Sequence, residues 1–208
     1  MLVPDRSREQ WIRYDSCVWN APTILRQVVR LRAHYQDCEK LFVKVLGIKE
    51  AGLDHIVHEF CSESRGNRQP AVQRFEKLCT TLARFVSQTR GELTTNQLAR
   101  IRDAPVFPVL RSRDDSQEDS GMLWRSIRDG GWYIPDRITL ESVFRGRIGM
   151  LEMSVKSAKT LQPLFTALGC KTMFLSECVQ EVVEPRGNSI RDLPIERDLK
   201  TRLEHISQ

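Results

Sequence analysis

The stretch Asp129–Ser154, DGGWYIPDRITLESVFRGRIGMLEMS, carries the pattern that decides the fold class. Strand-like runs at Met122–Ile127 and Trp132–Pro135 flank Asp129 and Gly130. An Asp-Gly pair between two such runs is typical of a hairpin turn, because glycine adopts positive φ at little steric cost. The sequence therefore predicts a β-hairpin at this point.

The residues on either side of this hairpin extend the pattern. Asp136–Phe144 predicts a short helix with Asp136 as its N-cap. Arg147–Ser154 alternates apolar residues and predicts a third strand. Upstream, Val106–Leu110 predicts a short strand, and its neighbouring prolines place that strand at a sheet edge or a strand end. Between them, the polar and acidic Ser112–Gly121 predicts a surface loop.

The remainder of the chain is mostly helical in pattern. Apolar residues recur at three- and four-residue steps, as on one face of an amphipathic helix. The predicted helices are Ala21–Ala33, Asp37–Leu46, Gly52–Ser62, Ala71–Arg90, Thr94–Ala104, Val155–Leu168 and Asp192–His205, and Lys171–Gly187 fits either helix or strand. The sequence predicts an α+β fold: a helical region over 1–104, and a small antiparallel sheet with flanking helices over 105–208, packed as one unit.

Composition excludes several classes of protein. The chain has 208 residues, a net charge of +5 and 28% charged residues, as in an ordinary globular protein. No stretch approaches the roughly 20 apolar residues that a membrane helix requires, and the charged N-terminus does not resemble a secretory signal. We therefore expect a cytoplasmic or nuclear protein without membrane contact. The two charge signs are interspersed, which disfavours nucleic acid as a partner.

The segment HIVHEFC contains the most suggestive polar cluster. His55, His58 and Cys61 are three residues apart on one predicted helix, and Cys38 and Cys79 on neighbouring helices would complete a zinc site. The H-x-x-H spacing differs from the H-E-x-x-H of metalloproteases. A Cys61–His58 nucleophile pair lacks an orienting third group in the nearby sequence. The structural alternative is that both histidines lie at the edge of an apolar helix face.

A second polar cluster follows Pro135. Asp136 and Arg137, with Glu141 and Arg145, would form a polar site, although a helix cap and an i,i+4 ion pair explain the same residues. The sequence contains no nucleophile elbow, phosphate-binding loop or dinucleotide fingerprint. It therefore indicates no catalytic residue, cofactor or metal. His55, His58, Cys61, Asp136 and Arg137 remain the candidate site residues.

Four segments follow one another in an order that identifies a lineage: DSCVWNAPTILRQVVRLRAHYQDCEKLFVKVLGI, VFPV, WYIPDRITLESVFRGRIGMLEMS and LQPLFTALGCKTMFLSECVQEVVEPRG. They resemble the C-terminal part of large fungal proteins that carry a GHKL-type (sacsin-like) ATPase domain far upstream. In that family the third segment reads W-[FY]-I-A-D-R-x-x-L-x-x-x-F, and PLL..L and LS..V.E motifs follow. The matching residues here are Trp132, Tyr133, Ile134, Asp136, Arg137, Leu140, Phe144, Pro163, Leu164, Leu168, Leu175, Ser176, Val179 and Glu181.

The resemblance spans roughly Asp15–Gly187, and the chain departs from it at Pro135, where the family has alanine. The ATP-binding motifs of that family, an Asn-rich helix and a D-x-G-x-G loop, do not occur in this sequence, so no ATPase residue is carried over. The resemblance implies a fragment or remnant of a chaperone-like multidomain protein.

We therefore expect a non-enzymatic interaction or scaffold domain that binds protein partners. Its predicted surface consists of the arginine-studded helices and the acidic loop Ser112–Gly121. Two alternatives remain open. One is a small accessory protein or enzyme of fungal secondary metabolism with a Cys/His or Asp/Arg site in a concave pocket. The other is a weak nucleic-acid-binding module, whose affinity would fall steeply with salt.

Overall fold

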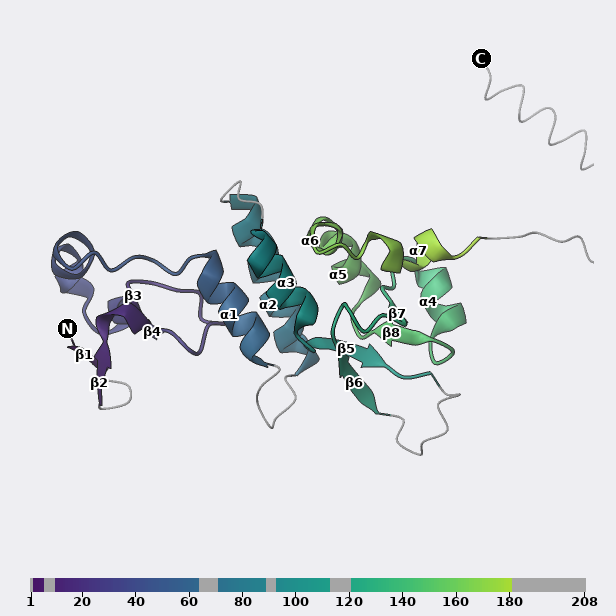
Figure 1. The fold of residues 1–208 in the computed structure, drawn as a ribbon, viewed down its shortest axis with the longest axis horizontal. Coiled ribbons are helices and arrows are strands. Elements are labelled where there is room, and N and C mark those ends of the chain that lie inside the picture. The colour runs from purple at the N-terminus through teal and green to yellow at the C-terminus, as the bar shows by residue number, and fades with distance from the viewer. Residues whose placement is uncertain (1, 6–9, 64–70, 89–92, 113–120, 181–208) are drawn as a thin grey trace, which may run out of the picture.

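The computed structural model describes residues 2–5, 10–63, 71–88, 93–112 and 121–180. The molecule is elongated: a small N-terminal lobe lies at one end, three helices occupy the middle, and a sheet with further helices forms the other end (Figure 1). Helices and one four-stranded sheet make this an α+β protein, as the sequence predicts. The helical part is concentrated in α1 to α3 rather than spread over residues 1–104.

The N-terminal lobe, residues 2–51, is built from short strands and turns. Its elements are β1 (Leu2–Asp5), β2 (Gln10–Arg13), the 3₁₀ turn η1 (Tyr14–Ser16), β3 (Cys17–Val18), β4 (Val29–Arg30), the 3₁₀ turns η2 (Leu31–Ala33) and η3 (Gln36–Cys38), and the π-helix η4 (Lys40–Val45). Strands β1 and β2 pair antiparallel, and β3 and β4 pair parallel. The lobe has its own small core, in which Trp19 stacks on Phe42 beside the buried Leu31.

The predicted helix over Ala21–Ala33 is wrong. Turns, the strand β4 and the 3₁₀ turn η2 occupy these residues instead. The reason lies in where the apolar side chains go: Leu25 is buried in the main core of the molecule, whereas Leu31 is buried in the core of the lobe. One helix presents a single apolar face and cannot serve two separate cores. The predicted helix over Asp37–Leu46 is present only as η3 and the π-helix η4.

Three predicted helices are confirmed as α1 (Leu53–Ser62), α2 (Val72–Gln88) and α3 (Thr95–Asp103). Thr94 caps α3, because its hydroxyl accepts from the Gln97 N–H while the Gln97 side chain accepts from the Thr94 N–H. At the centre of the core, rings from α1, α2 and the sheet meet. Phe60 and Phe75 both contact Phe107, which stacks on Trp132 at 5.4 Å between ring centroids.

The sheet has the strand order β6-β5-β8-β7, formed by β6 (Met122–Arg125), β5 (Phe107–Leu110), β8 (Gly149–Leu151) and β7 (Trp132–Tyr133). Strand β5 pairs antiparallel with β6 and β8, but β7 pairs parallel with β8. The sheet is therefore mixed, and the expectation of a purely antiparallel sheet is wrong.

The predicted hairpin around Asp129 and Gly130 is also wrong. Strands β6 and β7 lie at opposite edges of the sheet and run in the same direction. The connection folds on itself, because the Ser126 N–H donates to the Asp129 carboxylate and the Asp129 N–H donates to the Ser126 hydroxyl. The Trp132 indole then donates to the Ser126 carbonyl at 3.0 Å. Burial of Trp132 against Phe107 decides the path of this connection.

Pro108 is the second residue of β5, which lies between β6 and β8, so of the two expected positions the sheet edge is wrong. Proline offers no N–H to a strand ladder but keeps its carbonyl. The Pro108 carbonyl accepts from the Glu152 N–H at 2.7 Å, just beyond the end of β8. Strand β5 thus tolerates a proline at this position, because the neighbouring Glu152 N–H requires only the Pro108 carbonyl as a hydrogen-bond acceptor.

The remaining helices cover the sheet: α4 (Ile138–Phe144), α5 (Val155–Thr160), α6 (Gln162–Ala167), the 3₁₀ turn η6 (Lys171–Met173) and α7 (Leu175–Cys178). The predicted helix Val155–Leu168 breaks at Leu161, where Pro163 begins α6 from its first turn. Gly169 ends α6 with a φ of +84°, as a C-terminal stop. The predicted helix Asp192–His205 lies outside the described residues, as do Glu181–Gly187.

Candidate functional site

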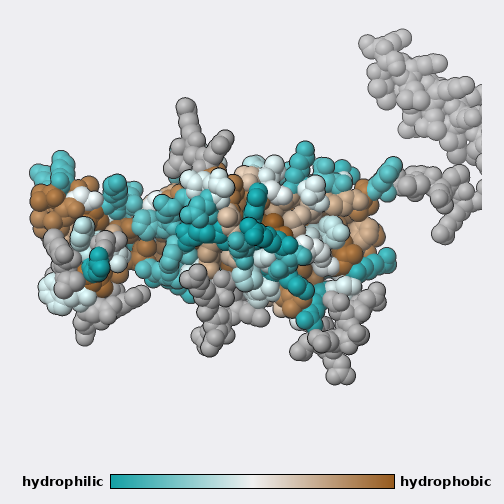
Figure 2. Space-filling model, viewed as in Figure 1, coloured by the Kyte–Doolittle hydropathy of each residue, from teal (hydrophilic) through white to brown (hydrophobic). Residues whose placement is uncertain are grey.

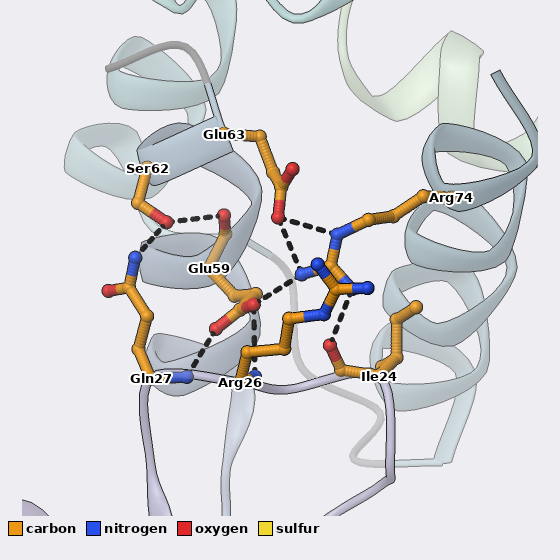
Figure 3. Close-up of polar contacts among 7 residues, drawn as sticks. All are labelled: Ile24, Arg26, Gln27, Glu59, Ser62, Glu63 and Arg74. Carbon is orange, nitrogen blue, oxygen red and sulfur yellow. Dashed lines mark hydrogen bonds and ion pairs between the residues drawn. The ribbon is translucent and has the colours of Figure 1, made fainter. Parts of the chain in front are cut away.

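The most unusual polar cluster is buried between α1 and α2. Glu59 and Glu63 come from the end of α1, and Arg74 comes from the first turn of α2. The Glu59 side chain is 2% exposed and that of Arg74 is 9% exposed. We call these three residues the clasp, because they hold an irregular segment of the lobe, residues 22–27, which we call the strap (Figure 3).

The Glu59 carboxylate accepts three hydrogen bonds. The backbone N–H of Arg26 donates to Oε1 at 3.0 Å, and that of Gln27 donates to Oε2 at 3.1 Å. The Arg74 guanidinium donates to Oε1 at 2.5 Å. A buried carboxylate is tolerated only when it is paired and hydrogen-bonded, and here both oxygens have partners.

Every nitrogen of the Arg74 guanidinium is also used. Its Nε donates to Glu63 at 2.6 Å and its Nη1 donates to the Ile24 carbonyl of the strap at 3.0 Å. Burial alone would lower the pKa of Arg74, but the hydrogen bond to Glu63 and the charges of both glutamates outweigh burial and raise the pKa. The guanidinium is therefore a permanent cation that fixes Glu59.

The clasp grips main-chain atoms of the strap. It contacts one carbonyl and two N–H groups, at Ile24, Arg26 and Gln27. Between these contacts, the Leu25 side chain is buried in the main core. Arg74 pairs with both glutamates of the cluster, and the strap N–H groups occupy the remaining lone pairs of Glu59. Chemically, this arrangement holds a turn of the chain, in which the Leu25 N–H donates to the Pro22 carbonyl, by its backbone and by a buried apolar side chain.

The candidate residues of α1 lie apart from the clasp. His55 accepts from the Gly52 N–H at 3.1 Å, so it caps the start of α1. His58 is exposed, and the Cys61 thiol donates to the Arg100 carbonyl at 3.5 Å. His58 and Cys61 do line a small pocket of about 280 Å³ together with Asp103. Among the described residues, no group of three or more His, Cys, Asp and Glu side chains is placed to hold a metal ion.

The other candidate residues lie at the far end of the molecule. Asp136 does not cap α4, because the N-cap position belongs to Arg137 and lacks a side-chain hydrogen bond. The Asp136 carboxylate instead accepts from both the N–H and the hydroxyl of Ser176, at the first turn of α7. Arg137 is exposed. The i,i+4 pair of Glu141 and Arg145 is present at 2.7 Å.

Residues that carry the resemblance pack around this same contact. Leu140 and Leu175 are buried together with Met150, and Tyr133, Phe144 and Val179 pack against them. The Asp136–Ser176 hydrogen bonds tie the same two helices together. These residues therefore have a structural role in joining α4, α7 and the sheet.

Sequence reasoning missed Glu59 and Arg74 as partners. The sequence did contain a signal for this pair, because each of the two residues lies on the apolar face of its helix. Glu59 lies three residues after Ile56, and Arg74 lies four residues before Leu78. A negative charge on one apolar face and a positive charge on the next indicate a buried pair, since such residues are almost never buried unpaired.

The fold and the clasp together define an α+β domain whose first two helices hold an irregular segment of the same chain. A family model described as Domain of unknown function (DUF8348) matches residues 54–179, more than half of the chain. The chain therefore belongs to the DUF8348 family. The matched region begins within α1, so the strap and the lobe precede it.

Searches of the curated proteins and of the solved structures found no match. Over the residues that the structure describes, no helix is both long and apolar enough to cross a bilayer.

Proposed function

We propose that the chain is a non-catalytic protein-interaction module that acts as a scaffold. One observation carries this proposal: each polar residue that is buried in the described core makes hydrogen bonds that hold the fold together, namely Glu59, Arg74, Gln97 and Ser126. Glu59 and Arg74 hold the strap, His55 caps α1, and Asp136 joins α4 to α7. A catalytic group must instead present its reactive atom to a substrate in a cleft.

Uncovered apolar side chains support a role in binding proteins. On α4, Ile138 is 74% exposed and Val143 is 49% exposed. At the other end of the molecule, Val45 is 73% and Leu41 is 48% exposed on the π-helix η4. Figure 2 shows apolar residues at both ends and a hydrophilic band across the middle of this face. Exposed apolar groups rimmed by polar residues are typical of interaction sites.

The resemblance to sacsin-like fungal proteins supports a more specific proposal. The module would be a fragment or remnant of a chaperone-like multidomain protein, in which its two ends contact neighbouring domains or client proteins. The elongated arrangement in Figure 1, with uncovered apolar residues at either end, suits a connecting element.

The test is affinity capture with the full chain, followed by identification of bound proteins. The double variant Ile138→Asp/Val143→Asp is expected to lose partners bound at α4, and Leu41→Asp/Val45→Asp those bound at η4. Asn96→Asp, on the exposed face of α3, is the matched control and is expected to retain all partners. A purified chain that captures no protein but converts a substrate in a metabolite screen would contradict the proposal.

One observation favours the alternative of a small enzyme of secondary metabolism. His58, Cys61 and Asp103 line one pocket, although Asp103 is already paired with Arg128 at 2.6 Å. A Cys61→Ser variant that folds normally but loses a measurable conversion would support this alternative over the scaffold.

A further inference from the structure

We propose that the groove between α1 and α2 is a peptide-binding site, and that the strap is a built-in occupant which a segment of a partner protein with the same turn replaces. The ligand is defined by chemistry: a free carbonyl, then an apolar side chain, then two consecutive residues with free backbone N–H groups. This inference rests on the proposed function only because it assumes a protein partner. The binding site that it names is distinct from the exposed apolar residues of α4 and η4.

The contacts themselves allow exchange. The clasp recognises the Ile24 carbonyl and the N–H groups of Arg26 and Gln27, which almost any sequence supplies. Three side chains of the strap add selectivity: Leu25, which is buried, Ile24, which packs against the main core, and Gln27, which donates to the Ser62 hydroxyl at 2.6 Å. Recognition therefore combines main-chain hydrogen bonds with two adjacent apolar side chains.

Part of the receptor half is held in place without the strap. Arg74 holds Glu59, and Glu63 holds Arg74 in turn. Glu59 and Arg74 both lie in the region matched by the family model, whereas the strap lies before it. When the strap leaves, the Glu59 carboxylate keeps its hydrogen bond from Arg74 and loses two N–H donors, which a replacement peptide with two free N–H groups supplies again.

The strap is able to leave while the rest of the lobe stays in place. It is a loop between β3 and β4, which pair with each other, and the Arg32 N–H donates to the Trp19 carbonyl beside this pair, while the Trp19 N–H donates to the Lys49 carbonyl. Release of the strap leaves these contacts intact. An open groove of about 670 Å³ also adjoins the strap and extends along α2 to Arg84, with room for flanking residues of a partner.

The test measures binding of a labelled peptide with the sequence of residues 20–30, NAPTILRQVVR, by fluorescence anisotropy. In the unaltered full chain the strap fills the groove and competes with the peptide. In the full-chain variant Leu25→Glu the anchor is lost, so we expect the peptide to bind at least about tenfold more tightly, since apparent affinity scales with the fraction of open sites.

Two controls test the mechanism. Adding Glu59→Gln to the Leu25→Glu chain should abolish the gain, because the acceptor for two N–H groups is altered. A peptide carrying Arg26→Pro lacks one of these N–H groups and should bind at least about tenfold more weakly. Equal binding of both peptides would overturn the proposal.

A second variant with a released strap distinguishes loss of binding from misfolding. Arg26→Pro in the full chain removes one strap contact without altering a core side chain, and should also raise peptide affinity. Cooperative thermal unfolding and the near-ultraviolet circular dichroism of the buried Trp132 report folding. If neither variant with a released strap binds the peptide, the proposal is wrong. Lost capture of cellular partners with intact peptide binding would count against the proposed scaffold function alone.

Discussion

At the scale of single residues, Glu59 is the side chain that most affects the stability of the contact between α1, α2 and the strap. A carboxylate on the apolar face of α1 costs several kcal/mol to desolvate, and it is stable there because three donors surround it. A substitution at this position removes charge from a site where Arg74 remains buried. Arg74 keeps its ion pair with Glu63, so the loss consists of its buried charge pair with Glu59 and of the acceptor for the two strap N–H groups.

We expect Glu59→Gln to lower the free energy of unfolding by about 3 kcal/mol, because one partner of a buried pair is removed. Urea unfolding followed by tryptophan fluorescence at pH 7 measures the change. Glu76→Gln, on α2 and only partly buried, is the matched control and should change stability by less than about 0.5 kcal/mol. Similar losses in the two variants would show that the clasp does not act as a buried pair.

Two buried cysteines make the fold sensitive to alkali. Burial raises the pKa of Cys170 to about 12, with Arg102 opposing in part, and burial raises the pKa of Cys79 well above its usual value. An unfolded thiol ionises near 9. Above that pH the unfolded chain releases protons that the folded chain keeps, so the free energy of unfolding falls by about 1.4 kcal/mol per pH unit per thiol up to the folded pKa.

The measurement is the slope of unfolding free energy against pH between about 9 and 11. Cys170→Ala loses core packing at every pH, but its slope should be shallower than that of the unaltered chain by the contribution of one thiol. Leu168→Ala, which loses core packing but no thiol, is the comparison and should keep the original slope. Parallel curves for the unaltered chain and Cys170→Ala would contradict the assignment.

At the scale of elements, the capping box at the start of α3 gives a clean test. Thr94→Ala removes the hydroxyl that accepts from the Gln97 N–H, and we expect a loss of about 1 kcal/mol. Thr95→Ala, at the next position, removes a similar hydroxyl from the exposed first residue of the helix. It should change stability by only a few tenths of a kcal/mol. Equal effects would mean that side-chain volume, rather than the cap, sets the loss.

Elements were predictable where one periodic face serves one core. Helices α1, α2 and α3 satisfy this condition, and the sequence predicts all three. The helix over Ala21–Ala33 fails it, because Leu25 and Leu31 enter different cores. The hairpin failed for another reason: local turn chemistry cannot reveal that Trp132 is drawn to Phe107 across the sheet.

The candidate site was also predictable only where it depends on local sequence. Histidine and cysteine spacing directed attention to His55, His58 and Cys61, and the structure gives His55 a capping role. The clasp depends on a contact between separate helices, Glu59 of α1 and Arg74 of α2, and on backbone N–H groups of the strap. Backbone partners leave no trace in side-chain identity, so only the two charges on apolar faces were visible in the sequence.

At the scale of the whole molecule, the clasp couples the lobe to the helices. Amide hydrogen exchange should show the N–H groups of Arg26 and Gln27 protected in the unaltered chain, because Glu59 holds both. In Glu59→Gln, protection should fall across the strap while the central turns of α2 remain protected, since local opening does not require global unfolding. Loss of protection throughout the chain would mean that lobe and helices unfold together.

The strand order has a consequence for how the chain assembles during synthesis. Strand β8 occupies a central slot between β5 and β7, although both of these strands precede it in the chain. Until Gly149–Leu151 leaves the ribosome, one side of β5 and the side of β7 that pairs with β8 stay open. Unpaired strand edges of this kind recruit other chains. Nascent chains that end before residue 149 are therefore expected to aggregate, whereas chains that extend past α7 close the sheet and stay dispersed.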